Sequence, residues 1–208
     1  MIFKDRIEAA KLLANKLSKY KDEPGVVMAV PKGGVPLAYI VAKELDFPMQ
    51  IIFTKKIGHP TNKEYAIGAA SLTDYFVEPH HEVSREYIEQ ELKLVRAKLQ
   101  GMADKFSGKY DTVDLKEKTV LIIDDGMATG NTLLSTVQLL RKSYPAKIVI
   151  AVPVASIEAV DKLKNKVDEL LVLHIPPYFE SVGSFYENFD NVSEDDVLSY
   201  LEKMKGRI

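Results

Sequence analysis

The chain of 208 residues contains no cysteine. This absence excludes disulfide bonds, thiolate catalysis and zinc sites built from cysteine. The four histidines are too scattered along the sequence to suggest a metal cluster. The one adjacent pair, His80 and His81, would point in different directions on a strand, and we interpret both as surface residues.

The sequence also lacks a long apolar run and an excess of charge of one sign. No stretch approaches the roughly 20 apolar residues that cross a bilayer. The charged N-terminal segment, residues 1–17, has no secretory apolar core, so we expect a cytoplasmic protein without a membrane partner. The 28 Lys and Arg and the 30 Asp and Glu give a net charge of −2. This balance disfavours nucleic acid as a partner, although a local basic patch would still allow RNA binding.

Apolar residues recur in a pattern that is typical of alternating strands and helices. The length and the 46% hydrophobic content suit one globular domain with a small accessory piece. Buried strands are predicted at 26–30, 49–54, 119–124, 147–155 and 169–175, two short strands at 66–71 and 75–79, and helices at 5–19, 37–45, 84–106, 132–142 and 157–164. This alternation predicts an α/β fold, a mostly parallel twisted sheet with helices on both faces.

The last 33 residues differ in character from the rest of the chain. They are rich in tyrosine and phenylalanine and are interrupted near their start by Pro176, Pro177 and Gly183. We therefore expect a core over residues 1–175 and a C-terminal segment over residues 176–208. In an alternative interpretation, the segment simply packs its aromatic side chains into the core.

Three unusual loops begin where predicted strands end: PKGG, KKIGHPTNKEY and DDGMATGNT. In open parallel sheets, ligands bind outside the carboxyl ends of the strands. Because all three loops would meet at this edge of the sheet, together they indicate a binding site more strongly than any one of them does alone.

The stretch DDGMATGNT joins a buried strand to a helix through a glycine-bounded loop. Backbone N–H groups and the helix N-terminus in such a loop form a cradle for phosphate. Asp124 and Asp125 would repel a phosphate unless they hold something else, and ionised carboxylates accept hydrogen bonds from hydroxyls or bind Mg²⁺. The chain lacks the P-loop pattern G-x-x-x-x-G-K-[ST]. The stretch therefore predicts a ligand that carries both hydroxyls and a phosphate.

The segment VLIIDDGMATGNT resembles the phosphoribosyl-pyrophosphate (PRPP) signature of type I phosphoribosyltransferases. PKGG stands in the place of that family's pyrophosphate loop, and residues 55–66 resemble its flexible catalytic loop. The similarity extends over nearly the whole chain. It is greatest to a bacterial and archaeal group of "predicted phosphoribosyltransferases" with no assigned substrate, which shares P-[KR]-G-G-V-P, [KR]-K-[LI]-G-x-P and a late P-P-x-F.

The resemblance implies transfer of ribose 5-phosphate from PRPP to a nitrogenous base with release of pyrophosphate, as in nucleobase salvage. It also implies Mg²⁺ as a cofactor, a homodimer, a hood formed by residues 176–208 and a cis peptide between Pro31 and Lys32. The implied residues are Asp124, Asp125, Lys55 and Lys56 for catalysis; Gly126, Met127, Ala128, Thr129, Gly130, Asn131 and Thr132 for the 5-phosphate; Pro31, Lys32, Gly33 and Gly34 for pyrophosphate; and Tyr178, Phe179 and Val182 for the base. Asp124 and Asp125 would meet the metal indirectly, through PRPP hydroxyls or water.

The match departs from the family at positions that read the base. Hypoxanthine-type enzymes have an aspartate where this chain has Ala128, and a lysine after the following strand where this chain has the stretch PVAS. Recognition of a 6-oxopurine is therefore not indicated, and the base stays open. A PRPP-sensing regulator without catalysis is the rival hypothesis. A relative of PRPP synthases is disfavoured, because a chain of this length lacks their second domain copy.

Overall fold

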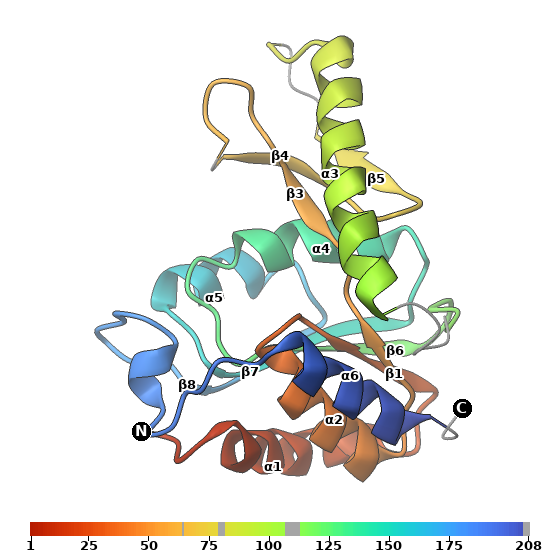
Figure 1. Cartoon of the computed structure of the whole chain (residues 1–208). Helices are drawn as coiled ribbons and strands as arrows, with labels where there is room; N and C mark the ends of the chain where they lie inside the picture. Colours follow the sequence, from red (N-terminus) through yellow and green to blue (C-terminus); the bar gives the residue numbers. More distant parts are fainter. Residues whose placement is uncertain (64, 79–81, 107–112, 206–208) are drawn as a thin grey trace.

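The computed structural model describes residues 1–63, 65–78, 82–106 and 113–205, so the pair His80 and His81 lies outside it. Two sheets organise the protein (Figure 1): a five-stranded sheet in the body of the molecule and a three-stranded sheet that stands above it beside a long helix. None of the helices in the described ranges is both long enough and apolar enough to span a membrane.

The larger sheet has the strand order β2-β1-β6-β7-β8, and all of its neighbouring strands are parallel. Its strands are β1 (Gly25–Ala29), β2 (Met49–Ile51), β6 (Thr119–Ile123), β7 (Lys147–Val154) and β8 (Glu169–His174). The central strands β1 and β6 are buried along their whole length. This arrangement confirms the predicted parallel sheet and places the carboxyl ends of its strands along one edge.

Helices cover both faces of this sheet, as predicted (Figure 1). On one face lie α1 (Arg6–Leu17) and α2 (Gly34–Leu45), and on the other lie α4 (Asn131–Arg141) and α5 (Ile157–Leu163). Because successive strand side chains point to opposite faces, Val27 and Leu121 join the core beneath α1 and α2, whereas Val26 and Ile122 join the core beneath α4 and α5. The two cores hold the helices and sheet together as one unit.

The smaller sheet is antiparallel, with the order β3-β4-β5. Its elements are β3 (Lys55–Gly58), β4 (Ala66–Ala70) and β5 (Tyr75–Val77), and the helix beside it is α3 (Arg85–Phe106). The loop that we predicted from residue 55 begins as a strand, because Lys55 and Lys56 pair with Ala70 and Ala69. The two predicted short strands and the long helix are confirmed.

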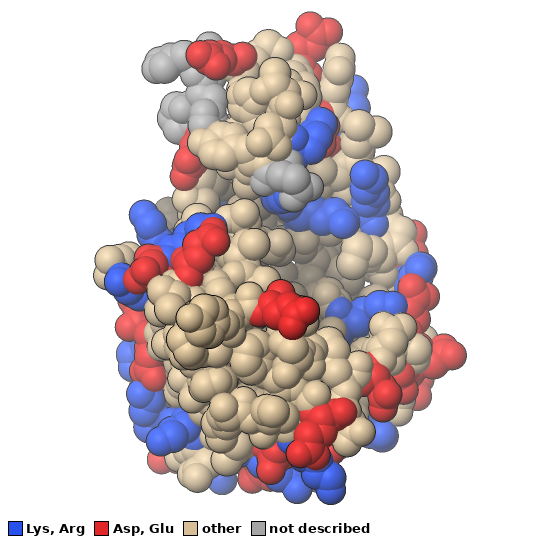
Figure 2. All heavy atoms as spheres, turned by 90° about the vertical axis from the view of Figure 1, so that its left-hand side faces the viewer, with Lys and Arg blue, Asp and Glu red and all other residues tan. Residues whose placement is uncertain are grey.

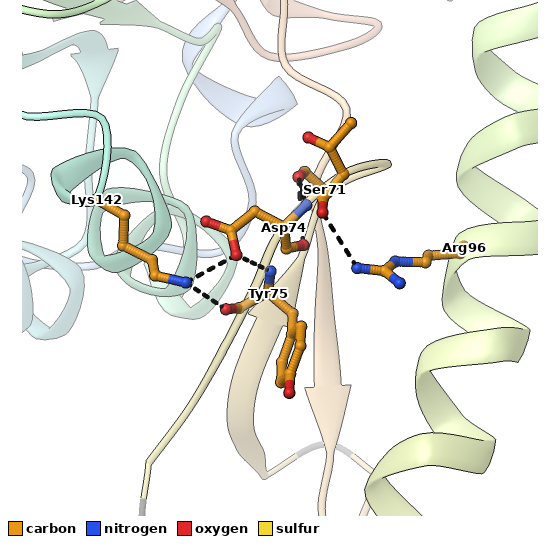
Figure 3. Close-up of polar contacts among 6 residues, drawn as sticks. Ser71, Asp74, Tyr75, Arg96 and Lys142 are labelled. Atoms are coloured by element: carbon orange, nitrogen blue, oxygen red, sulfur yellow. Dashed lines mark hydrogen bonds and ion pairs between the residues drawn. The ribbon is translucent and has the colours of Figure 1, made fainter.

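The turn between β4 and β5 connects the smaller sheet to the helices on either side of it (Figure 3). Lys142, at the end of α4, donates to the carboxylate of Asp74 at 2.7 Å and to the carbonyl of Tyr75 at 2.8 Å. From the other side, Arg96 of α3 donates to the carbonyl of Thr73 at 3.4 Å. The ion pair of Lys142 with Asp74 is exposed and contributes only about 0.2–1 kcal/mol. Together with the two hydrogen bonds to carbonyl groups, it orients the turn and adds little to the stability of the fold.

The sequence analysis missed a helix in the C-terminal segment. Residues 176–192 contain only the short turn η2 (Gly183–Phe185), but α6 (Glu194–Met204) follows and packs against α2. Ser193 opens α6 with a capping box that includes Asp196, and Val197, Leu201 and Met204 are buried in the core beneath α1 and α2. The capping pattern and the spacing of these apolar residues would have predicted the helix.

The burial of α6 can be tested through stability. Leu201→Ala should lower the free energy of unfolding by about 2–5 kcal/mol, because it leaves a cavity at a side chain that is 2% exposed. Lys203→Ala, at an exposed position of the same helix, should change it by no more than about 0.5 kcal/mol. Urea denaturation measures both, and equal small effects would show that α6 does not belong to the core.

Candidate functional site

Two of the predicted loops lie side by side because the strands that precede them are paired. Ala29 at the end of β1 is in register with Ile123 at the end of β6, and the N–H of Val30 donates to the carbonyl of Ile123 at 3.0 Å. The chain then enters the predicted pyrophosphate loop, residues 31–34, on one side and the acidic loop, residues 124–132, on the other; residues 126–132 of the acidic loop are the predicted phosphate loop. The peptide between Pro31 and Lys32 is cis, as the resemblance implied.

The two glycines of the pyrophosphate loop allow it to pack directly against the aspartates. A Cβ atom on Gly33 would lie 2.0 Å from Oδ2 of Asp125, and one on Gly34 would lie 2.5 Å from the carbonyl oxygen of Ile123 and 2.9 Å from Cα of Asp124. The sequence predicted that these glycines would admit a diphosphate. The structure shows another requirement, which is contact with the end of β6.

The acidic pair is compact and only partly exposed to solvent. The N–H of Asp125 donates to Oδ1 of Asp124 at 2.8 Å. Burial, followed by the negative charge of Asp125, raises the pKa of Asp124 well above its usual range. Asp125 accepts hydrogen bonds from Nε and Nη2 of Arg6 at 3.0 and 2.8 Å. The sequence analysis missed Arg6 as a candidate site residue, because in the sequence it is one of several charged residues at the start of the N-terminal helix.

The phosphate loop, residues 126–132, leads into the N-terminus of α4. Gly130 is the N-cap in the left-handed conformation, with φ of 68°, and no side chain caps this end of the helix. The N–H groups of the first turn therefore lack intrahelical partners. Met127 is different, because its side chain is buried and its N–H already donates to the carbonyl of Val154 at 2.9 Å. It shapes the loop rather than offering a donor to a ligand.

A lysine from α5 supports the phosphate loop from behind. Nζ of Lys162 donates to the carbonyl of Thr129 at 2.8 Å and to Oδ1 of Asn131 at 2.7 Å. Ser156 adds a hydrogen bond from its hydroxyl to the carbonyl of Ala128. These contacts hold two carbonyl groups and one side chain of the loop in place. The sequence analysis had assigned no role in the site to Lys162 or Ser156.

A cavity of about 620 Å³ opens between the two sheets. Figure 2 shows this side of the molecule hollowed, with Lys and Arg side chains on the rim. Pro31 of the pyrophosphate loop and Thr132 of the phosphate loop line it from below. Its basic residues come from the smaller sheet, the loop after β3 and α3: Lys55, Lys56, Lys63 and Lys98. The fold thus brings the predicted lysines opposite the two loops, and adds Lys98, which the sequence analysis had not singled out.

The three predicted base-binding residues lie in different environments. Tyr178 is 90% exposed, and Phe179 packs its ring against Phe185 with centroids 5.5 Å apart. Val182 lies against the start of the phosphate loop, where a Cβ atom on Gly126 would come within 2.5 Å of its side chain. Among these three, Val182 is the residue that directly adjoins the acidic loop.

The close approach of the two loops predicts a strong effect of one methyl group. Gly34→Ala should lower the free energy of unfolding by about 1–3 kcal/mol, because its Cβ would meet backbone atoms that cannot move aside. Gly101→Ala in α3 is the matched control, since nothing lies within 4 Å of its added Cβ. It should stabilise the helix by about 0.5–1 kcal/mol. Chemical denaturation of both variants measures the difference, and equal effects would contradict this packing.

The raised pKa of Asp124 predicts how stability depends on pH. Above about pH 4 an unfolded aspartate loses its proton, whereas the folded chain retains one on Asp124 to higher pH, so folding becomes less favourable as pH rises between the two pKa values. Asp124→Asn removes this cost. The difference in melting temperature between Asp124→Asn and the native chain should become more positive as the pH is raised from 4 to 8. For the exposed control Asp161→Asn, the same difference should change little with pH. A constant difference across this range would contradict the prediction.

Known proteins similar to this chain identify its family. The model of the "Phosphoribosyl transferase domain" matches residues 3–184. A Mycobacterium tuberculosis protein named "Putative phosphoribosyl transferase" is 32% identical over 210 residues, which is 97% of this chain and 47% of that protein. The chain therefore spans about half the length of this curated relative. A 67-residue segment, 31% of the chain, is 37% identical to 24% of a ribose-phosphate pyrophosphokinase of Pyrococcus furiosus.

A solved structure agrees with the whole fold. The crystal structure of TT1426 from Thermus thermophilus superimposes with a TM-score of 0.94 at 33% sequence identity, covering 99% of this chain and 100% of that one. The agreement includes both sheets and the C-terminal helix, because so little of either chain is left out. The chain belongs to the phosphoribosyl transferase domain family.

Proposed function

We propose that the protein is a phosphoribosyltransferase that transfers ribose 5-phosphate from PRPP to a nitrogenous base and releases pyrophosphate. The observation that carries this proposal is the packing of the pyrophosphate loop against the acidic loop, beside a cavity that Pro31 and Thr132 of these loops line together with lysines of the smaller sheet. Family membership supports it. The proposal is also supported by the 67-residue segment that is similar to a ribose-phosphate pyrophosphokinase, because the name of that enzyme includes both ribose phosphate and pyrophosphate.

In this proposal the acidic loop binds the sugar phosphate. Asp124 and Asp125 accept hydrogen bonds from the ribose hydroxyls and stabilise positive charge that develops on the ring as pyrophosphate leaves. The 5-phosphate lies at the open N-terminus of α4, where N–H groups and the helix dipole favour an anion. Thr129 and Thr132 add hydroxyl donors.

The pyrophosphate leaves toward the cavity between the sheets. Residues 31–34 approach it through their backbone, and Lys32, Lys55 and Lys56 offset its negative charge. The family resemblance supplies these roles, and the cavity supports them by bringing Pro31, Lys55 and Lys56 to one space. Lys98 of α3 lines the same space and adds a fourth lysine to those the resemblance named.

The residues present fit Mg²⁺ that arrives with the substrate rather than a metal held by the protein alone. Within the described ranges, no group of three or more His, Asp or Glu side chains could hold an ion. Mg²⁺ commonly binds through one or two carboxylates together with substrate phosphates, and Asp124 and Asp125 supply those carboxylates through water or PRPP hydroxyls. When bound, Mg²⁺ offsets the charge of the leaving diphosphate.

We place the acceptor base beside residues 176–192, the part of the predicted hood (residues 176–208) that precedes α6, over a core of residues 1–175. Val182 adjoins the phosphate loop, and Phe179 offers a half-buried ring on the same segment. α6 itself packs into the core through Val197, Leu201 and Met204.

The proposal predicts release of pyrophosphate when the protein is incubated with PRPP, Mg²⁺ and a suitable member of a panel of nucleobases and small amines. Combining Asp124→Asn with Asp125→Asn should lower the rate by about 100-fold or more, because it removes charge that stabilises the transition state. Asp161→Asn, a control on an exposed helix surface, should retain the native rate.

Binding measured by calorimetry separates the remaining outcomes. Tight binding of PRPP without release for any acceptor would favour the PRPP-sensing regulator over the enzyme. If PRPP did not bind at all, the role assigned to the acidic loop would be wrong, and both functions would be excluded together.

A further inference from the structure

Arg6 stands at the start of α1 and reaches the acidic loop from a distant part of the chain. Its side chain is 11% exposed, and that of Asp125 is 14% exposed. Nε and Nη2 both donate to Asp125, at 3.0 and 2.8 Å, across a separation of 119 residues in the sequence. An ion pair this enclosed is far less screened by solvent than the surface pairs of the chain. Arg6 therefore fixes where the carboxylate of Asp125 lies.

The two hydrogen bonds from Arg6 end on the same oxygen, Oδ2. Gly33 also packs against this oxygen, which leaves it no room to turn toward the loop. No hydrogen bond to the other oxygen, Oδ1, is present among the described residues. The carboxylate thus has one oxygen held by the protein and one available to accept a hydrogen bond from a ligand.

Arg6 also contacts the C-terminal segment. Its Nη1 donates to the carbonyl of Asp190 at 2.6 Å, and its guanidinium lies 3.9 Å from the centre of the Phe189 ring. Tyr186 stacks beside Phe189 with centroids 5.0 Å apart and donates its hydroxyl to the backbone carbonyl of Asp125 at 2.6 Å. Asp125 is therefore held twice, by its backbone through Tyr186 of this segment and by its side chain through Arg6 of α1, which the same segment contacts.

A lysine could not make this set of contacts. The planar guanidinium donates in several fixed directions and stacks on an aromatic ring, whereas an ammonium is a compact point charge. Arg6 uses all three of its donor nitrogens and one face of its plane at once. Without this cation, Asp125 would keep a poorly compensated charge beside Asp124 and would be free to turn toward solvent.

We infer that Arg6 is a positioning residue for PRPP: it holds Oδ2 of Asp125 so that Oδ1 meets a ribose hydroxyl, and it joins this carboxylate to the segment beside the acceptor. The inference rests on the proposed function and adds to it a residue outside all of the predicted loops. Arg6 itself does not touch the reacting atoms. Its effect should therefore be confined to ligands that carry the ribose hydroxyls.

Binding of two ligands by a set of variants tests this role. Dissociation constants for PRPP and for inorganic pyrophosphate, which has no ribose, are measured by calorimetry with Mg²⁺ at one fixed concentration. The variants are Arg6→Met, which keeps the aliphatic stem, Arg6→Lys, which keeps the charge, and Lys11→Met, an exposed control on the same helix. Melting temperatures without ligand report separately on folding.

We expect Arg6→Met to weaken PRPP binding by about tenfold or more, the equivalent of one well-made hydrogen bond to a charged group. Its affinity for pyrophosphate should stay within about twofold of the native value. Arg6→Lys should recover part of the loss, and Lys11→Met should bind both ligands as the native chain does. In an Asp125→Asn background, Arg6→Met should add less than about a twofold further loss, because the group that it positions is already gone.

Several results would overturn the inference. These are native PRPP affinity in both Arg6 variants, equal weakening of PRPP and pyrophosphate, or losses from Arg6→Met and Asp125→Asn that simply multiply. If Arg6→Met does not fold, Arg6→Lys decides by the same comparison of the two ligands. If the native chain binds pyrophosphate but not PRPP, the proposed function fails and this inference fails with it. Native PRPP binding that is indifferent to Arg6 defeats the inference alone.

Discussion

Two adjacent carboxylates at the end of a buried strand are the constraint on which the rest of the site depends. Placing Asp124 and Asp125 together, partly out of water, costs free energy, and the raised pKa of Asp124 expresses that cost. The protein offsets it with the guanidinium of Arg6 and an internal hydrogen bond from the N–H of Asp125. Ionised carboxylates accept hydrogen bonds from hydroxyl groups, which is the physical basis for proposing a sugar as the ligand of this pair.

The parallel pairing of β1 with β6 turns this local feature into a site. It brings the pyrophosphate loop to the acidic loop, and Gly33 and Gly34 allow the two to touch. Lysines of the smaller sheet line the same cavity as residues of both loops. The sheet is held there by apolar side chains of β3 and β4 that share a buried core with α3, and the β4–β5 turn adds polar contacts with α3 and α4 (Figure 3). The two loops contribute glycines and carboxylates to the candidate site, and the smaller sheet contributes lysines.

Much of the fold followed from local patterns. The apolar runs of β1 and β6 are strong signals because both faces of these strands are buried. The periodicity of α3 is a strong signal because one stripe of that helix is buried. The start of β3 was mistaken for a loop because two lysines and a glycine carry no strand signal of their own, and pairing with β4 supplies it. The helix α6 was missed because aromatic residues and prolines before it obscured its cap.

The sequence by itself determined the α/β class, the alternation of strands and helices that makes the larger sheet parallel, and the loops that form the candidate site. These features depend on spacing within short stretches, where backbone geometry and hydrophobic burial act on neighbouring residues. Only the tertiary structure decided that Arg6 meets Asp125 and that Lys98 lines the same cavity as Pro31. These contacts join segments far apart in the chain, and their existence depends on how α1 and α3 pack against the sheets, which no local pattern specifies.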